Sequence, residues 1–191
     1  MKKTMLRGLV LLFSIMTLVS CSESEGNVSY DTKDLLGKWN LTNYTYNGKF
    51  EISGGPAAIP NTTFAGEGIN INATTTFTEN PNKANAEGSY DIKLTTTSDG
   101  DTTTDIHKIG DITSVANWEL NGNVLNLANG ELVGGNLPNQ ISSFVNIGNA
   151  DFKITELNSN SLKLRKSIEQ NISQGGITVK INIDIAVDYT K

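Results

Sequence analysis

The fold is decided near the end of the chain, in residues 177–189, ITVKINIDIAVDY. Every odd-numbered residue of this stretch is apolar or aromatic, and all but one of the even-numbered residues are polar. Because alternate side chains of a strand point to opposite faces, the pattern predicts one strand with one apolar face. Thirteen residues at about 3.3 Å each span roughly 43 Å, whereas an ordinary strand has about five or six residues.

The preceding segment, 161–173, repeats this character. Its apolar residues share one parity, which Lys166 and Gln170 interrupt; they are Leu162, Leu164, Ile168 and Ile172. The intervening Gly175 and Gly176 tolerate the positive φ angles of a tight turn. We therefore expect one long antiparallel hairpin. Two such strands with a single apolar stripe must curl over a core, as in a closed or nearly closed barrel.

Shorter hairpins fit the same plan. Asn121-Gly122 is a strong turn signal and would set Trp118 opposite Leu125, both facing inward. Phe152 and Ile154 belong to another strand. The strand around Tyr90–Leu94 returns after residues 98–101. A three-residue loop would pair Leu94 with Ile106, and a two-residue loop would pair it with Asp105. We favour three residues because register follows the buried face.

The remaining chain completes the strand count. Trp39 and Leu41, and then Ile69 to Phe77, add further strands, which gives eight to ten in all. Segments 50–66 and 128–150, rich in Gly, Asn and Pro, are expected to be long loops, with a short helix at 138–145 as one option. The prediction is an all-β fold, an antiparallel up-and-down barrel over residues 34–191, with no second domain.

The first twenty residues have a different character. Lys2, Lys3 and Arg7 precede the uncharged apolar stretch 8–20. That stretch is shorter than the roughly 20 residues that span a bilayer, and it has the proportions of a signal peptide. The sequence Leu18-Val19-Ser20-Cys21 that follows resembles the end of a bacterial lipoprotein signal.

This resemblance implies cleavage before Cys21 and acylation of that residue. Two or more acyl chains would anchor the protein to a membrane without spanning it, since each buried methylene adds about 0.8 kcal/mol. The alternative is a secretory signal with a chance Cys, or a buried Cys. Residues 21–33 would then be a tether, whose acidic start, Ser22–Asn27, loosely resembles the surface-display signal of Bacteroidota lipoproteins. A flexible spacer accounts for the same residues.

Composition excludes several functions. Lys2, Lys3 and Arg7 carry three of the 15 positive charges, so the chain after residue 20 has 12 against 20 negative charges, a net charge of −8. A nucleic-acid backbone needs clustered Lys and Arg, so we expect no nucleic-acid partner. One Cys and one His allow no internal disulfide, thiolate cluster or multi-imidazole metal site.

Catalytic and metal motifs are not found. His107 is expected on the outer face of its strand, where solvent surrounds it, and no Gly-x-Ser-x-Gly elbow exists. Asp99-Gly100-Asp101 lacks the spacing of a calcium loop and suits a hairpin tip. A glycosidase pair of carboxylates cannot be selected among 20 acidic residues. We predict no enzyme, no metal and no cofactor.

Three further motifs carry a family resemblance. Gly37-Lys38-Trp39 is similar to the Gly-x-Trp that opens the first strand of lipocalins, and the runs 118–127 and 152–164 are similar in order and spacing to the lipocalin-like lipoproteins of Bacteroidota. The resemblance implies that Gly37 begins the first strand and that Trp39 plugs one end of the barrel. Lipocalins often pack an Arg of the last strand over this Trp. Here that strand offers only Lys180 and Lys191, and Arg165 lies one strand earlier.

The predicted function follows from the barrel. Its interior residues line a pocket if a cavity remains and otherwise fill a core; they are Phe77, Trp118, Leu125, Phe152, Ile181 and Ile183. We expect an outer-membrane lipoprotein, periplasmic or surface-exposed, that binds a small apolar or amphiphilic ligand. The alternative is a surface module that binds glycan or protein through its long loops.

Overall fold

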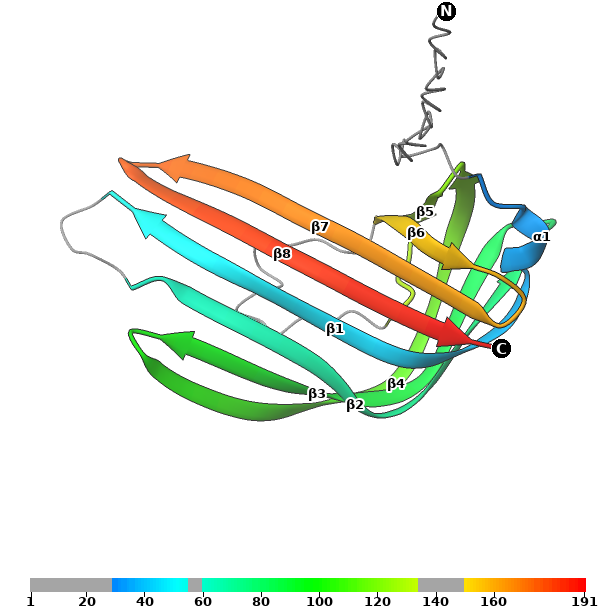
Figure 1. Ribbon diagram of the computed structural model, residues 1–191, viewed down its shortest axis with the longest axis horizontal. Helices are drawn as coiled ribbons and strands as arrows, with labels where there is room; N and C mark the ends of the chain where they lie inside the picture. Colours follow the sequence, from blue (N-terminus) through cyan, green and yellow to red (C-terminus); the bar gives the residue numbers. More distant parts are fainter. Residues whose placement is uncertain (1–28, 55–59, 134–149) are drawn as a thin grey trace, which may run out of the picture.

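The computed structural model describes residues 29–54, 60–133 and 150–191. A short helix, α1 (Thr32–Leu35), precedes eight antiparallel strands that pair in chain order and close on themselves (Figure 1). The strands are β1 (Gly37–Ser53), β2 (Thr62–Thr78), β3 (Lys83–Ser98), β4 (Asp101–Asn121), β5 (Val124–Ala128), β6 (Asp151–Leu157), β7 (Ser161–Gln174) and β8 (Ile177–Thr190). The prediction of an all-β up-and-down barrel is confirmed, with eight strands.

The long C-terminal hairpin is also confirmed. β7 and β8 pair without interruption from Ser161 opposite Thr190 to Gln174 opposite Ile177. Gly175 and Gly176 form the turn with φ angles of 60° and 81°, the left-handed values that a two-residue hairpin loop needs. β8 also pairs along β1, so it has a neighbouring strand on each side. Its apolar face is buried inside the barrel.

The barrel is closed at one end and open along one side at the other. β5 and β6 are short, and they pair with β4 only over Asn117–Asn121 and with β7 only over Leu162–Arg165. Beyond those pairs, the described residues give β4 and β7 no further strand on that side. Figure 1 shows the β3–β4 and β7–β8 hairpins extending well past β5 and β6. We call this the wide end, and the end that carries α1 the narrow end.

The segment predicted as a loop at 50–66 is shorter than expected. β1 continues to Ser53 and β2 begins at Thr62, so Phe50 and Phe64 lie within strands. The prediction was wrong because irregular pairing after Asn40 in β1 and after Ile69 in β2 moves the inner face from one parity to the other. Once strict alternation fails, the apolar pattern no longer reads as one strand.

The β3–β4 register also differs from the prediction. The loop has two residues, Asp99 and Gly100, both at positive φ, and Leu94 pairs with Asp105. Ile106 is therefore on the outer face and 62% exposed. His107 pairs with buried Ile92 and so has the inner-face parity, although it is exposed. A register shift between Gly88 and Tyr90 changes which parity of β4 faces inward. Strict alternation therefore predicts the wrong partner for Leu94.

The β4–β5 turn is displaced by one residue from the prediction. Asn121 pairs with Val124, so the turn residues are Gly122 and Asn123, and Trp118 lies opposite Leu127 instead of Leu125. The face is as predicted, because Trp118 and Leu125 are both buried. The short helix suggested at 138–145 lies outside the described residues. Among the residues that are described, helix α1 is too short to cross a membrane.

Candidate functional site

The narrow end is closed by a plug around Trp39. Its side chain is fully buried, and its Nε1 donates a hydrogen bond of 2.7 Å to the carbonyl oxygen of Leu35, at the end of α1. Lys191 Nζ lies 4.3 Å from the centre of the Trp39 ring and donates to the carbonyl oxygen of Asp34 at 3.0 Å. Gly37 begins β1 at a φ of 111°. Lys191 therefore takes the position over the Trp where lipocalins often have Arg.

The predicted interior residues all face the inside of the barrel but do not form one site. Phe77 and Trp118 meet edge to face near the plug, with ring centres 6.2 Å apart, and Leu125 is buried beyond them. Phe152 lies on β6, next to the open side. Ile181 and Ile183 belong to β8 on the way to the wide end. All six have exposed fractions of 4% or less. Phe77, Trp118 and Leu125, at the narrow end, are therefore core residues.

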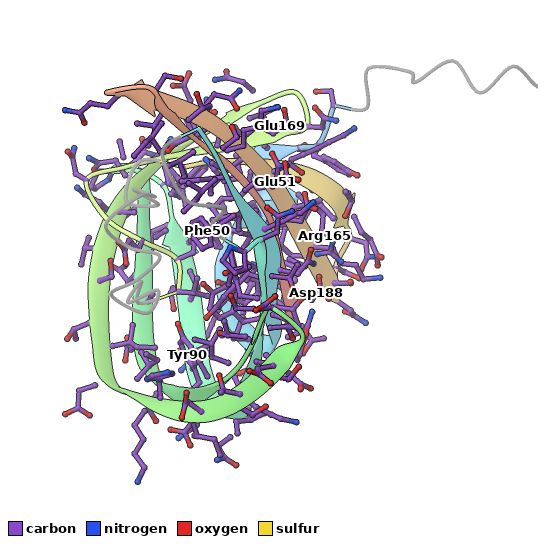
Figure 2. All side chains as sticks on the ribbon, turned by 90° about the vertical axis from the view of Figure 1, so that its left-hand side faces the viewer. Phe50, Glu51, Tyr90, Arg165, Glu169 and Asp188 are labelled. Atoms are coloured by element: carbon purple, nitrogen blue, oxygen red, sulfur yellow. The ribbon has the colours of Figure 1, made fainter. Side chains whose placement is uncertain are left out.

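A second group of aromatic residues lies at the wide end, and sequence reasoning did not assign it. The Tyr44 ring centre lies 5.8 Å from that of Tyr46 and 5.6 Å from that of Tyr90, and Phe64 lies 6.2 Å from Tyr46 and 5.1 Å from Phe50. Figure 2, a view from the wide end, shows Phe50 and Tyr90 within the ring of strands. The signal was the spacing of Tyr44, Tyr46 and Phe50, which the expected loop at 50–66 concealed.

Two of these rings lie flat against the wall, each over a glycine of the neighbouring strand. Tyr46 pairs with Gly66, and Gly48 pairs with Phe64. A Cβ at Gly66 would lie 2.1 Å from Tyr46 Cζ, and one at Gly48 would lie 2.3 Å from Phe64 Cζ. Aromatic rings that cover glycines across a strand pair fix register. Because these rings lie along the wall, they extend less far into the interior.

The hydroxyl groups of the buried tyrosines are not equally satisfied. Tyr189 Oη accepts a hydrogen bond from Thr75 at 3.2 Å and donates to the Leu132 carbonyl oxygen. Tyr46 is 1% exposed, and its hydroxyl has no hydrogen-bond partner. Burial raises the pKa of Tyr44, Tyr46, Tyr90 and Tyr189 above the usual value, so all four remain neutral at physiological pH.

The outer face carries three adjoining hollows. One of about 300 Å³ lies over Ala65 and Gly66, a second of about 300 Å³ over Gly48, and a third of about 270 Å³ between Asn47 and Arg165. Asn47 borders all three, and threonines supply much of the lining. Arg165 forms an ion pair with Asp188 on the same outer face (Figure 2).

The acidic residues of the described ranges do not gather into a metal site. Across those ranges, no group of three or more His, Cys, Asp or Glu side chains could hold a metal ion. Asp99 and Gly100 form the β3–β4 turn, with Asp101 opening β4, which accounts for that acidic run. Cys21 lies outside the described residues, so the structure does not place the predicted lipidation site.

A closed antiparallel barrel with a plugged end and an aromatic inner wall defines a class of binding modules. The family model of the lipocalin-like domain matches residues 35–164, and the chain belongs to this family. Its fold typically serves binding without catalysis. A comparison with solved structures matched a lipocalin-like protein from Bacteroides uniformis ATCC 8492, with 17% identity and a TM-score of 0.27, covering 78% of this chain and 96% of that one. A comparison with curated proteins found no match.

Proposed function

We propose that the chain is a lipid-anchored protein of the outer membrane whose barrel binds a small amphiphilic ligand at its wide end, without catalysis. The observation that carries this proposal is the Tyr46 hydroxyl, buried among aromatic rings with no partner. Leaving a buried hydroxyl unsatisfied costs about 1–3 kcal/mol, so native proteins usually pair it. A ligand with a polar atom and an apolar body would satisfy the hydroxyl and cover the rings.

The test is native mass spectrometry of the protein purified from its own cells, followed by identification of any small molecule that remains bound. We expect a stoichiometric ligand. Tyr46→Phe should weaken its retention about tenfold, which corresponds to a loss of about 1.4 kcal/mol in binding. The same variant should leave the empty protein as stable or more stable, because it removes an unsatisfied hydroxyl.

Tyr189→Phe is the matched control, since its hydroxyl already has partners within the protein. It should lower stability by about 1 kcal/mol and leave ligand retention unchanged. A protein that carries no small molecule, and that takes up no neutral apolar dye such as N-phenyl-1-naphthylamine, would contradict the proposal.

The anchor is tested separately. The described chain begins at the narrow end, where the Tyr30 amide donates to the Gly122 carbonyl oxygen at 3.2 Å. A tether from Cys21 would therefore hold the barrel by its narrow end and leave the wide end accessible. We expect the wild type in the membrane fraction and Cys21→Ser in the soluble fraction; unchanged partitioning would refute the anchor.

A surface module that binds glycan or protein is the second candidate. The hollows on the outer face favour it, since Asn47, Thr45 and Thr95 offer hydrogen-bonding groups there. Phe50 and Phe64, in the segment predicted as a loop at 50–66, do not support it, because they lie in strands and face inward. Asn47→Trp would fill the shared hollow, so it should abolish glycan or protein binding and leave dye uptake unchanged.

A further inference from the structure

One basic side chain lies on the inner face of the wide end. Lys166 of β7 pairs with Ile185 of β8, which in turn pairs with Tyr46 of β1, so the three residues form one row across the inner wall. The pairing of β6 with β7 stops at Arg165. Lys166 is thus the first inner-face residue beyond the closed part of the barrel.

Within the described ranges, Lys166 forms no ion pair. The ion pairs of the described residues join other groups, namely Lys49 with Glu51, Lys163 with Glu156 and Arg165 with Asp188. Lys166 Nζ lies 6.0 Å from the centre of the Phe152 ring, at the outer limit of a cation–π contact. Partial burial lowers the pKa of Lys166, and the more distant Asp151 carboxylate opposes that shift.

The wall between Lys166 and the wide end is mostly apolar, with Gln170 as a polar member opposite Ile181. On β8 the inner positions are Ile183 and Ile181, both buried, and then Val179. On β7 they include Ile168 and, nearer the hairpin tip, Ile172, which is 41% exposed. A partly buried ammonium group therefore lies at the inner end of a row of mostly apolar inner-face residues, and this row becomes exposed at Ile172 near the hairpin tip.

We propose that Lys166 binds the anionic head group of an amphiphilic ligand, whose apolar tail lies along Ile168, Ile181 and Ile183 toward the wide end. This inference rests on the proposed function and specifies its ligand class. An ammonium group has three donors and no acceptor, so an anion is its natural partner. Pairing with an anion compensates the desolvation that the lysine already bears. Lys166 would thus select for charge, while the aromatic wall and the isoleucines bind the tail.

A cationic ligand is the opposite possibility, because the Glu131 carboxylate lies near Tyr44 and Tyr90. Glu131 already interacts with other groups of the chain. Its charge raises the pKa of the two tyrosines. The row that contains the unpartnered Tyr46 hydroxyl also contains Lys166, which favours the anion.

The experiment measures displacement of N-phenyl-1-naphthylamine, a neutral dye, by ligands that share one tail. The ligands are oleate, oleyl phosphate, oleyl alcohol and oleylamine. The protein is the chain from residue 22 onward, which holds every strand of the barrel (Figure 1) and has no acyl chain to compete. Oleate and oleyl phosphate should each displace the dye about tenfold more tightly than oleyl alcohol. The better of the two identifies a carboxylate or a phosphate head group.

Lys166→Met should reduce that preference to less than about twofold, and Lys166→Arg should restore it. Lys153→Met is the matched control, because Lys153 is exposed on the outer face of the adjacent strand. It should keep the preference of the wild type. A preference that survives Lys166→Met, or tighter binding of oleyl alcohol or oleylamine to the wild type, would overturn the inference and leave ligand binding itself intact. Failure of the dye to bind at all would instead refute the proposed function, and this inference with it.

Discussion

Tyr46 and Gly66 show how a single residue pair shapes the interior. The ring of Tyr46 lies over the bare backbone of Gly66, where a Cβ would come within 2.6 Å of three of its atoms. The ring is also held on its other sides by Tyr44 and Phe64. Any group added at Gly66 must therefore displace an aromatic side chain that has little freedom to move.

Gly66→Ala should lower the free energy of unfolding by about 1–3 kcal/mol, the usual cost of overpacking a core. Urea denaturation followed by circular dichroism measures this change. Because the displaced Tyr46 ring turns into the interior, dye binding at the wide end should also weaken.

Gly110→Ala provides the control for the glycine substitution. Gly110 lies in β4, and a Cβ there would meet nothing within 4 Å. Its replacement should therefore change stability by about 0.5 kcal/mol or less. If the two alanine variants were equally stable, the flat ring would not depend on the glycine.

The narrow end is held by contacts that Lys191, the residue after β8, makes with α1 and β1. Its ammonium group lies over the Trp39 ring of β1 and donates a hydrogen bond to the Asp34 carbonyl oxygen of α1. Its position beside the last carbonyl groups of a helical turn is also the one that a positive charge favours. The lysine thus combines a cation–π contact with a cap.

Lys191→Met should lower the free energy of unfolding by about 1 kcal/mol, the usual worth of a partly exposed cation–π contact. Lys191→Arg should retain most of the stability, since a guanidinium can make both contacts. Thermal unfolding of the two variants measures the difference. Lys38→Met, at an exposed site on β1, is the comparison. If Lys38→Met lowered the free energy of unfolding equally, the effect would come from the lost positive charge and not from the contacts of the plug.

The sequence predicts these elements well where alternation is unbroken. The β7–β8 hairpin was found with its turn, because 177–189 alternates strictly and the two glycines punctuate it. The long strands β1 and β2 were partly missed, because each changes its inner parity at an irregularity. The β3–β4 register failed for the same reason. A bulge costs one residue locally but reverses every assignment beyond it.

The candidate site was harder to predict than the fold. Lys166 and Gln170 were visible as interruptions of an apolar stripe, yet alternation cannot say whether a polar inner residue faces solvent or a ligand. That depends on where β6 ends, which sets the open side of the barrel. The contact of Tyr46 with Gly66 depends on the β1–β2 register, which the local sequence does not contain.

The two ends of the barrel differ in the chemistry of their aromatic residues. The narrow end is sealed by tryptophans whose indole nitrogens are hydrogen-bonded, Trp39 to Leu35 and Trp118 to Thr78. The interior farther along β1 and β3 gathers Tyr44, Tyr46 and Tyr90 instead, and Tyr189 of β8 lies next to the plug, hydrogen-bonded to Thr75. These phenols are buried close enough to influence one another, so the protein carries a built-in sensitivity to alkaline pH.

The whole barrel should therefore unfold steeply above about pH 10. Burial raises the pKa of each of these four tyrosines in the folded state, so below their unfolded value of about 10 both states hold the proton and stability is unaffected. Above it the unfolded chain loses protons first, and each tyrosine removes about 1.4 kcal/mol per pH unit. Four together remove roughly 5 kcal/mol per unit, a large part of an ordinary domain's stability.

Phenolate absorbance at 295 nm and the β-sheet circular dichroism should thus change together, and Tyr90→Phe should reduce the slope of stability against pH by about a quarter. Phenolate absorbance from all four tyrosines near pH 10 in a barrel that stays folded would show that their burial does not restrain ionisation.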